Sequence, residues 1–188
     1  MKKDIIQIRW HGRGGQGAIT AAKIVANAAF ISGYSGVVMT PTFGTERRGA
    51  PVLTSLKISK KKIYDLSPIE EPDMIVVLDH LLLEEKGVTK GLKPGGTIIV
   101  NSPKSPDDYH FNEIKVATAD VTSIAVKAGL KQGIVNSGIL GAFAKASGLM
   151  DLEILTKEIE KEFKGKRPRK NAEAARLAFS MTNIGGMV

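Results

Sequence analysis

Residues 10–17 read Trp10-His11-Gly12-Arg13-Gly14-Gly15-Gln16-Gly17, and this stretch decides the fold that we expect. An alternating apolar run (residues 5–8) precedes it, and an alanine-rich run (residues 18–26) follows it. A strand, a glycine turn and a helix in this order form a phosphate-binding βα unit, and the glycines fit the pattern G-x-G-x-x-G. The N–H groups and the positive dipole end at the start of the helix would face an anion.

Each glycine of the pattern has an expected role. We expect Gly12 to allow the tight turn, Gly14 to let a phosphate approach the backbone, and Gly17 to let the helix pack closely on the strand. The motif alone is also compatible with a strand-to-helix turn that binds nothing.

Two common ligand classes fit this turn poorly. A dinucleotide-dependent dehydrogenase carries an acidic residue about 20 residues beyond its glycines. Here the expected second strand ends Met39-Thr40-Pro41, and no acidic residue appears before Glu46. A P-loop would end in Lys followed by Ser or Thr, whereas this turn ends Gln16-Gly17-Ala18. The turn therefore suits a different phosphorylated ligand, or none.

The composition excludes several classes of protein. The 188 residues suit one domain, and the chain has no cysteine, so it cannot hold a disulfide or an iron–sulfur cluster by itself. The net charge is +8, but the basic clusters at residues 57–62 and 161–170 lack interleaved aromatic residues, so we expect no nucleic-acid binding. No apolar run is long enough to span a membrane, and we expect a cytoplasmic protein.

Hydrophobic patterning predicts an α/β fold: a single three-layer Rossmann-like domain over residues 1–188, with a mainly parallel sheet and a helical C-terminal part. The helix after Asp120 is expected to end near Gly129, the next is capped by Asn136 and closed by Gly148, and the third is capped by Asp151. The expected strands are residues 4–10, 36–40, 52–58, 74–78, 97–100 and, as the last, 114–117; the expected helices are residues 15–32, 80–85, 120–128, 136–147, 151–163 and 171–181.

The candidate catalytic side chains form no complete constellation. His11 lies beside the turn but has no partner that would position it as a base. His80 and His110 lack the spacing of metal ligands. We therefore predict neither a catalytic residue nor a metal site in this chain.

The segment at residues 41–51 is the second candidate for binding. It carries Glu46, Arg47 and Arg48 between glycines. It is either an exposed charged loop, or Arg47 or Arg48 binds a phosphate or a partner's carboxylate. Because it follows the second strand, we expect it to lie close to the glycine turn.

Several blocks together resemble the gamma-subunit family of pyruvate:ferredoxin oxidoreductases, within the 2-oxoacid:acceptor oxidoreductases. The resemblance extends in order over nearly the whole chain. The form Arg47-Arg48-Gly49-Ala50 is more similar to pyruvate or branched-chain members than to 2-oxoglutarate or indolepyruvate members. The matching blocks are residues 8–22, 41–52, 71–79, 91–96 and 136–148.

The resemblance implies a complex that decarboxylates pyruvate with coenzyme A to acetyl-CoA and CO2 and reduces ferredoxin. It places thiamine diphosphate, Mg and iron–sulfur clusters in partner subunits (alpha, beta and delta), and gives this chain a part in coenzyme A binding and assembly. The alternatives are the gamma subunit of a 2-ketoisovalerate or other 2-oxoacid:ferredoxin oxidoreductase, and a free-standing nucleotide-binding enzyme. The implied coenzyme A region comprises Gly12, Arg13, Gly14, Gly15, Gln16 and Gly17, with Glu46 and Arg48 nearby or at a subunit contact.

Overall fold

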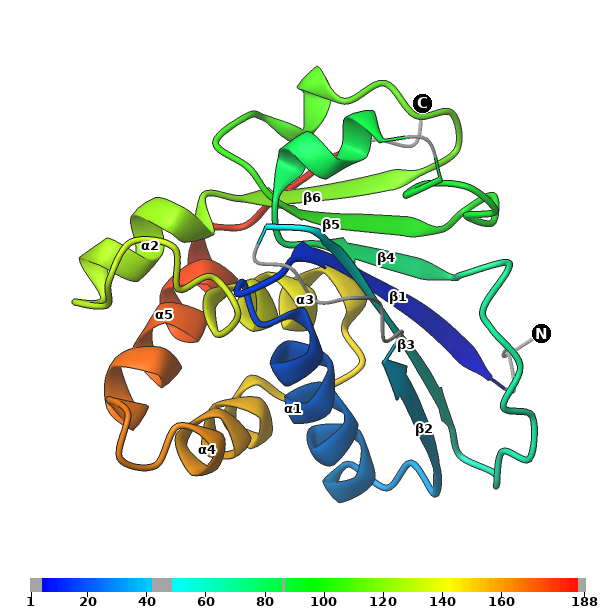
Figure 1. Cartoon of the computed structure of the whole chain (residues 1–188), viewed down its shortest axis with the longest axis horizontal. Coiled ribbons are helices and arrows are strands. Elements are labelled where there is room, and N and C mark those ends of the chain that lie inside the picture. Colours follow the sequence, from blue (N-terminus) through cyan, green and yellow to red (C-terminus); the bar gives the residue numbers. More distant parts are fainter. Residues whose placement is uncertain (1–4, 42–48, 86, 186–188) are drawn as a thin grey trace.

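One mixed sheet of seven strands organises the molecule (Figure 1). The computed structural model describes residues 5–41, 49–85 and 87–185. The strands lie in the order β2-β3-β1-β4-β5-β6-β7. Their bounds are β1 (Ile6–Arg13), β2 (Gly36–Pro41), β3 (Pro51–Ser59), β4 (Met74–Val77), β5 (Thr97–Asn101), β6 (Lys115–Ala119) and β7 (Asn183–Gly185). The helices are α1 (Ala18–Ile31), α2 (Val121–Lys127), α3 (Gly138–Ser147), α4 (Leu152–Glu162) and α5 (Pro168–Met181), with 3-10 turns η1 (His80–Glu84) and η2 (Pro106–Asp108).

The centre of the sheet is parallel, which confirms the predicted α/β class. Strands β1, β4, β5 and β6 pair in parallel, while β3 is antiparallel to both β1 and β2, and β7 is antiparallel to β6. A parallel return needs a crossover of about a dozen residues or more. The connection from β2 to β3 is shorter than that, so β3 runs back beside β1 and separates it from β2.

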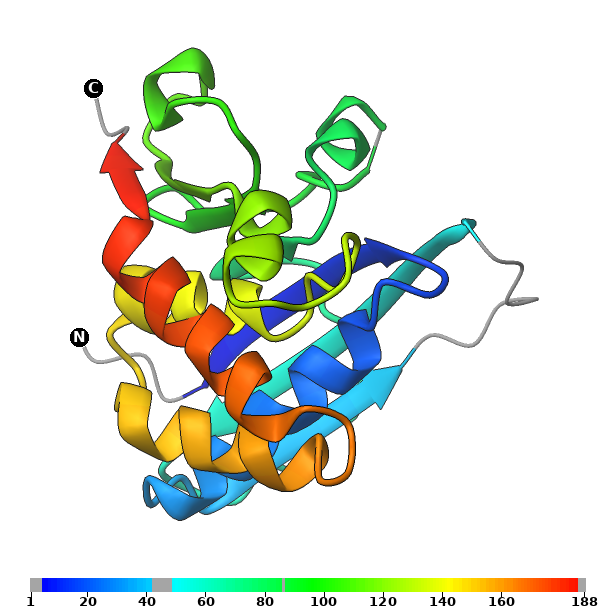
Figure 2. The same cartoon turned by 90° about the vertical axis from the view of Figure 1, so that its left-hand side faces the viewer.

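The two faces of the sheet are covered differently. The five α-helices lie on one face, where the main core contains Trp10 and Phe143 with ring centroids 5.4 Å apart (Figures 1 and 2). On the other face, Ile75, Val77 and Ile98 belong to a smaller core that Leu82 of η1 and neighbouring loops help to close. The third layer of the predicted fold is therefore built from 3-10 turns and loops. No helix in the described ranges is long and apolar enough to cross a membrane.

The predicted helix caps are confirmed at two of three positions. Asp120 accepts a hydrogen bond from Ser123 N–H, and Asp151 accepts from Glu153 and Ile154 N–H. The cap predicted at Asn136 is wrong, because α3 begins after Ser137 and no side chain caps it.

Other elements also differ from the prediction: α1 begins at Ala18 and not at residue 15, and the helix expected at residues 80–85 is the 3-10 turn η1. β1 extends to Arg13 because β3 pairs with it as far as Pro51. α5 begins at Pro168 and not at residue 171, since proline suits the first turn, where its missing N–H costs nothing. A further strand, β7, pairs with β6 at the edge of the sheet and was not predicted. Its three residues are too few to show a period-2 pattern in the sequence.

Candidate functional site

The glycine turn leads from β1 into α1 and is held by its own hydrogen bonds. Gln16 N–H donates to Arg13 O (2.9 Å), and the Gln16 side chain accepts from Arg13 N–H at Oε1 (2.7 Å). Gly15 and Gly17 have φ of +96° and +80°, in the left-handed region that favours glycine. The side chain of Gln16 therefore closes the turn from within.

The expected roles of Gly12 and Gly17 are wrong. Gly12 lies inside β1, and a Cβ there would be 3.1 Å from the Cβ of Ala18 and 3.6 Å from that of Leu78. Gly12 is thus the residue that lets the helix start approach the sheet. A Cβ on Gly17 would be 2.5 Å from Nδ2 of Asn136, so Gly17 forms the turn and accommodates a neighbouring loop.

A small hollow of about 220 Å³ lies at the N-terminus of α1. We call it the α1 hollow. The first turn of α1 has no acidic residue, and no side chain caps it. Within the described residues, the N–H groups of Gly15, Gly17, Ala18, Ile19 and Thr20 have no hydrogen-bond partner. Unpaired N–H groups at a helix start bind anions. The hollow is lined by Arg13, Gly14, Gly15, Gly17, Ala18, Ile19, Thr20 and Val52.

Arg13 contributes less positive charge to the α1 hollow than its position suggests. Its Nε lies 2.8 Å from Oδ2 of Asp79, and its Nη1 lies 3.6 Å from Oε1 of Glu85. These two carboxylates, Asp79 just after β4 and Glu85 just after η1, offset the positive charge of the Arg13 guanidinium. The anion would therefore be held mainly by the backbone of the turn.

The charged segment after β2 returns to the glycine turn at its described end. Gly14 N–H donates to Ala50 O (2.8 Å), and Gly49 N–H donates to Gly14 O (3.1 Å). This confirms that residues 49–51 lie beside the turn. It also means that the N–H of Gly14 already donates a hydrogen bond to Ala50 O and is not free to bind a phosphate. Glu46 and Arg48, together with Arg47, lie outside the described residues.

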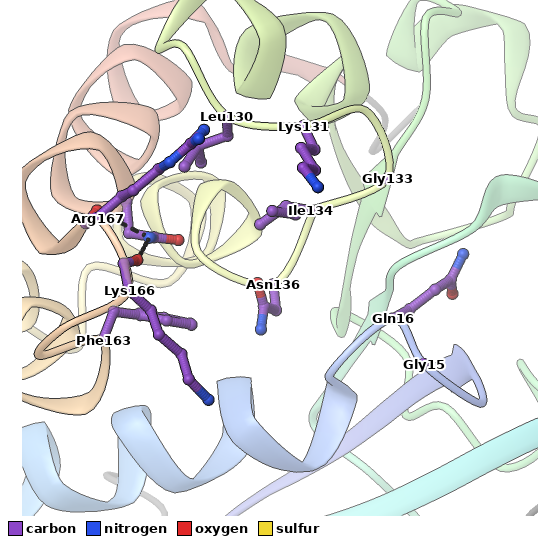
Figure 3. A pocket seen from close by; sticks show the side chains of 11 residues that line it. Gly15, Gln16, Leu130, Lys131, Gly133, Ile134, Asn136, Phe163, Lys166 and Arg167 are labelled. Atoms are coloured by element: carbon purple, nitrogen blue, oxygen red, sulfur yellow. Dashed lines mark hydrogen bonds between the residues drawn. The ribbon is translucent and has the colours of Figure 1, made fainter.

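A larger cleft of about 480 Å³ opens on the other side of Gly15 and Gln16. We call it the basic cleft. Figure 3 shows Lys131, Ile134 and Asn136 on one wall and Phe163, Lys166 and Arg167 on another, with Gly15 and Gln16 at a third side. Its remaining lining residues are Leu130, Gly133 and Asn171. The sequence showed the basic segment at 161–170 but gave no sign that it faces the glycine turn.

His11 is buried on the sheet face opposite the α-helices. Burial, and secondly the positive charge of Arg9, lower the pKa of His11 to about 4. The ring is therefore neutral at pH 7, and its Nε2 has no partner among the described residues. No group of three or more His, Asp or Glu side chains able to hold a metal occurs in the part of the chain that the structure covers. The glycine turn and the start of α1 can therefore bind an anion, but the described residues bring no acid–base pair to that anion.

Comparison with known proteins gives the family. The model of the family described as pyruvate ferredoxin/flavodoxin oxidoreductase matches residues 7–181. The chain belongs to this family. Named relatives confirm the expected resemblance to its gamma subunits.

Several relatives with known names are similar to this chain over nearly their whole length. The common gamma subunit of the pyruvate/ketoisovalerate oxidoreductases of Pyrococcus abyssi is 48% identical, with 96% of this chain and 98% of the relative covered. The pyruvate synthase subunit PorC of Methanocaldococcus jannaschii is 45% identical, with 94% and 96% covered. The crystal structure of the pyruvate oxidoreductase subunit PORC of Thermotoga maritima superimposes with a TM-score of 0.83 at 33% identity, covering 98% of this chain and all of that one.

Proposed function

We propose that this chain is the gamma subunit of a pyruvate:ferredoxin oxidoreductase complex. The complex would decarboxylate pyruvate, transfer the acetyl group to coenzyme A and pass the electrons to ferredoxin. The support is full-length similarity to gamma and PorC subunits at 45–48% identity. Because the Pyrococcus relative is named as common to pyruvate and ketoisovalerate oxidoreductases, a branched-chain 2-oxoacid is the second candidate substrate.

The chemistry of this reaction belongs to partner subunits in our proposal. Thiamine diphosphate with Mg and the iron–sulfur clusters would lie in alpha, beta and delta subunits of a cytoplasmic complex. The chain itself has no cysteine with which to ligate a cluster. What its described residues bring is a set of backbone N–H groups without hydrogen-bond partners at the start of α1. These are means of binding a ligand.

The role of this chain would be to hold the diphosphate of coenzyme A in the α1 hollow. The observation that carries this is the set of unpaired N–H groups of Gly15 and residues 17–20 around a hollow that has no acidic residue among its described lining residues. Two adjacent phosphates suit such a set, since each accepts several hydrogen bonds at a helix N-terminus. Glu46 and Arg48, which lie outside the described residues, are assigned in this proposal to the neighbourhood of the site or to a subunit contact, as the resemblance implies.

Purification of the tagged full chain from its source tests the complex. We expect alpha, beta and delta chains with the absorbance of iron–sulfur clusters, and ferredoxin reduction that needs both pyruvate and coenzyme A. A chain that purifies alone, active and with a bound nicotinamide nucleotide, would overturn the proposal.

Charge reversal tests the coenzyme A assignment. In the assembled complex, Arg48→Glu should raise the apparent KM for coenzyme A, whereas Arg169→Glu, the same charge change on an exposed residue away from the α1 hollow, should not. Equal KM values for both variants and the wild type would remove Arg48 from the site.

A further inference from the structure

The basic cleft is assembled from three segments far apart in the sequence. The glycine turn supplies Gly15 and Gln16, the connection from α2 to α3 supplies Lys131, Ile134 and Asn136, and the corner between α4 and α5 supplies Lys166 and Arg167 (Figure 3). At about 480 Å³ the cleft is in the range of small-molecule sites. It shares Gly15 with the α1 hollow, so the two spaces adjoin at the turn.

The charge of the cleft is positive and uncompensated. Lys131, Lys166 and Arg167 line it, and none of the described residues that line it is acidic. None of the three cations forms an ion pair with any residue that the structure describes. Other cations of this chain, such as Lys57 with Asp65 and Lys93 with Asp73, do have carboxylate partners. Several cations gathered around one concave space without a carboxylate favour a compact dianion, such as a phosphomonoester.

A buried amide at the wall of the cleft has a free acceptor. Asn171 is only 2% exposed, and its Nδ2 donates to Lys166 O (3.1 Å) and Arg167 O (3.0 Å), which fixes the orientation of the amide. Its Oδ1 has no partner among the described residues, and neither has Oδ1 of Asn136. A buried oxygen without a donor destabilises the folded chain, because it has lost its hydrogen bonds to water. An amino group of a ligand that enters the cleft would supply the missing donor.

The backbone at the same corner is strained. Arg167 has φ +59° and ψ +53°, a left-handed conformation that is unfavourable for a residue with a Cβ. Asn171 holds this conformation through its two hydrogen bonds to the corner carbonyls. Such strain persists where the surroundings over-determine it, and it gathers at ligand clamps.

The remaining wall is apolar. Leu130, Ile134 and Phe163 line the space between the cations. A flat ring with an exocyclic amine fits a surface that offers apolar contacts and free amide oxygens, whereas an inorganic ion would leave both unused.

We infer that the basic cleft binds a phosphorylated purine nucleoside, with the phosphomonoester at Lys131, Lys166 and Arg167 and the base amine toward the amides of Asn136 and Asn171. Two sources supply this chemistry. One is the 3′-phosphoadenosine end of coenzyme A, and this source rests on the proposed function, because its diphosphate would then lie in the adjoining α1 hollow. The other is a free nucleotide.

Binding of adenosine 3′,5′-bisphosphate to the purified complex tests the site. The lining variant Lys131→Ala/Lys166→Ala removes two cleft cations. The control Lys164→Ala/Arg169→Ala removes the same charge from exposed positions of the same basic segment that do not line the cleft. We expect the Kd in the lining variant to rise about tenfold or more, since the loss of one charged hydrogen bond already weakens binding by about that factor, and the control to bind as the wild type does. Absence of binding to the wild type, or equal weakening in both variants, would overturn the inference.

Steady-state kinetics with coenzyme A and 3′-dephospho-coenzyme A then distinguish the two sources. If the cleft holds the 3′-phosphate, the lining variant raises the KM for coenzyme A to that of the dephospho form and leaves the latter unchanged. If a free nucleotide is the ligand, the bisphosphate affinity falls while both KM values stay as in the wild type. Failure of the diphosphate assignment is a separate result: a negative charge placed in the α1 hollow would then leave the KM for coenzyme A unchanged.

Discussion

A negative charge at position 20 should selectively weaken the binding of coenzyme A. Thr20 lies in the first turn of α1 and lines the α1 hollow. Thr20→Glu places a carboxylate where the diphosphate is proposed to bind, and Thr20→Gln is the matched neutral control. The fold should tolerate both, because an acidic residue in the first turn of a helix stabilises it by about 0.3–1 kcal/mol.

The size of the effect follows from the size of the hollow. A space of about 220 Å³ is only a few ångströms deep, so an anion inside it lies about 7 Å or less from a carboxylate on its wall. At that distance each charge pair repels by about 0.6 kcal/mol in water and about 2.4 kcal/mol at an effective dielectric constant of 20. We expect the KM for coenzyme A to rise between about 3-fold and 50-fold in Thr20→Glu over Thr20→Gln.

The assay is ferredoxin reduction by the assembled complex with coenzyme A varied at saturating pyruvate. The effect should shrink as the salt concentration rises, since salt screens a partly exposed pair. The KM for pyruvate and the melting temperature should stay within error of the control. Equal coenzyme A KM values for the Glu and Gln variants would refute the placement of the diphosphate at this helix.

Three further outcomes concern the fold. Gly141→Ala should destabilise the chain by about 3 kcal/mol or more in denaturant titrations, because the added Cβ would lie 1.9 Å from Ala175 O and separate α3 from α5; a wild-type midpoint would contradict this packing. The pKa of His11 is depressed from 6.5 to about 4, so its contribution to stability is complete above pH 6.5, and up to about 3 kcal/mol is lost as the pH falls from 6.5 toward 4; His11→Gln should flatten the melting temperature over this window. Asp151→Ala should cost about 1 kcal/mol through loss of the α4 cap, whereas Asp151→Asn should cost little, as thermal melts would measure.

The sequence predicted those elements whose causes are local. Asp120 and Asp151 were identified as caps because a side-chain oxygen needs only N–H groups two or three residues ahead. Asn136 has the same chemistry, yet it packs its amide against Gly17, across the core. That contact depends on how α3 meets α1, so no local pattern contains it.

The roles predicted for Gly12 and Gly17 were wrong for the same reason, because they depend on contacts with distant segments. The spacing of the motif located the turn correctly, but β3 extends the ladder of β1 to Arg13 and so keeps Gly12 in the strand. The turn is thereby moved to Gly15 and Gly17, the residues with positive φ. The basic cleft could not be predicted at all, because its walls come from residues 15–16, 130–136 and 163–171, and only the packing of α5 on α3 and α4 brings them to one place.

The position of both spaces follows from one topological feature. The connection after β1 enters α1 on the helical face, and the connection after β4, its parallel neighbour, enters η1 on the opposite face. Ligands of open α/β sheets bind outside the carboxyl ends of two such strands. Here the crevice offers unpaired N–H groups and cations, and His11 of β1 is buried and neutral at pH 7. Interactions of this kind hold the distal part of a ligand equally in the ground state and in the transition state. Substitutions at Thr20 and Lys166 should therefore change the KM for coenzyme A while kcat stays constant, whereas a fall in kcat would mean that this remote binding energy positions the reacting end.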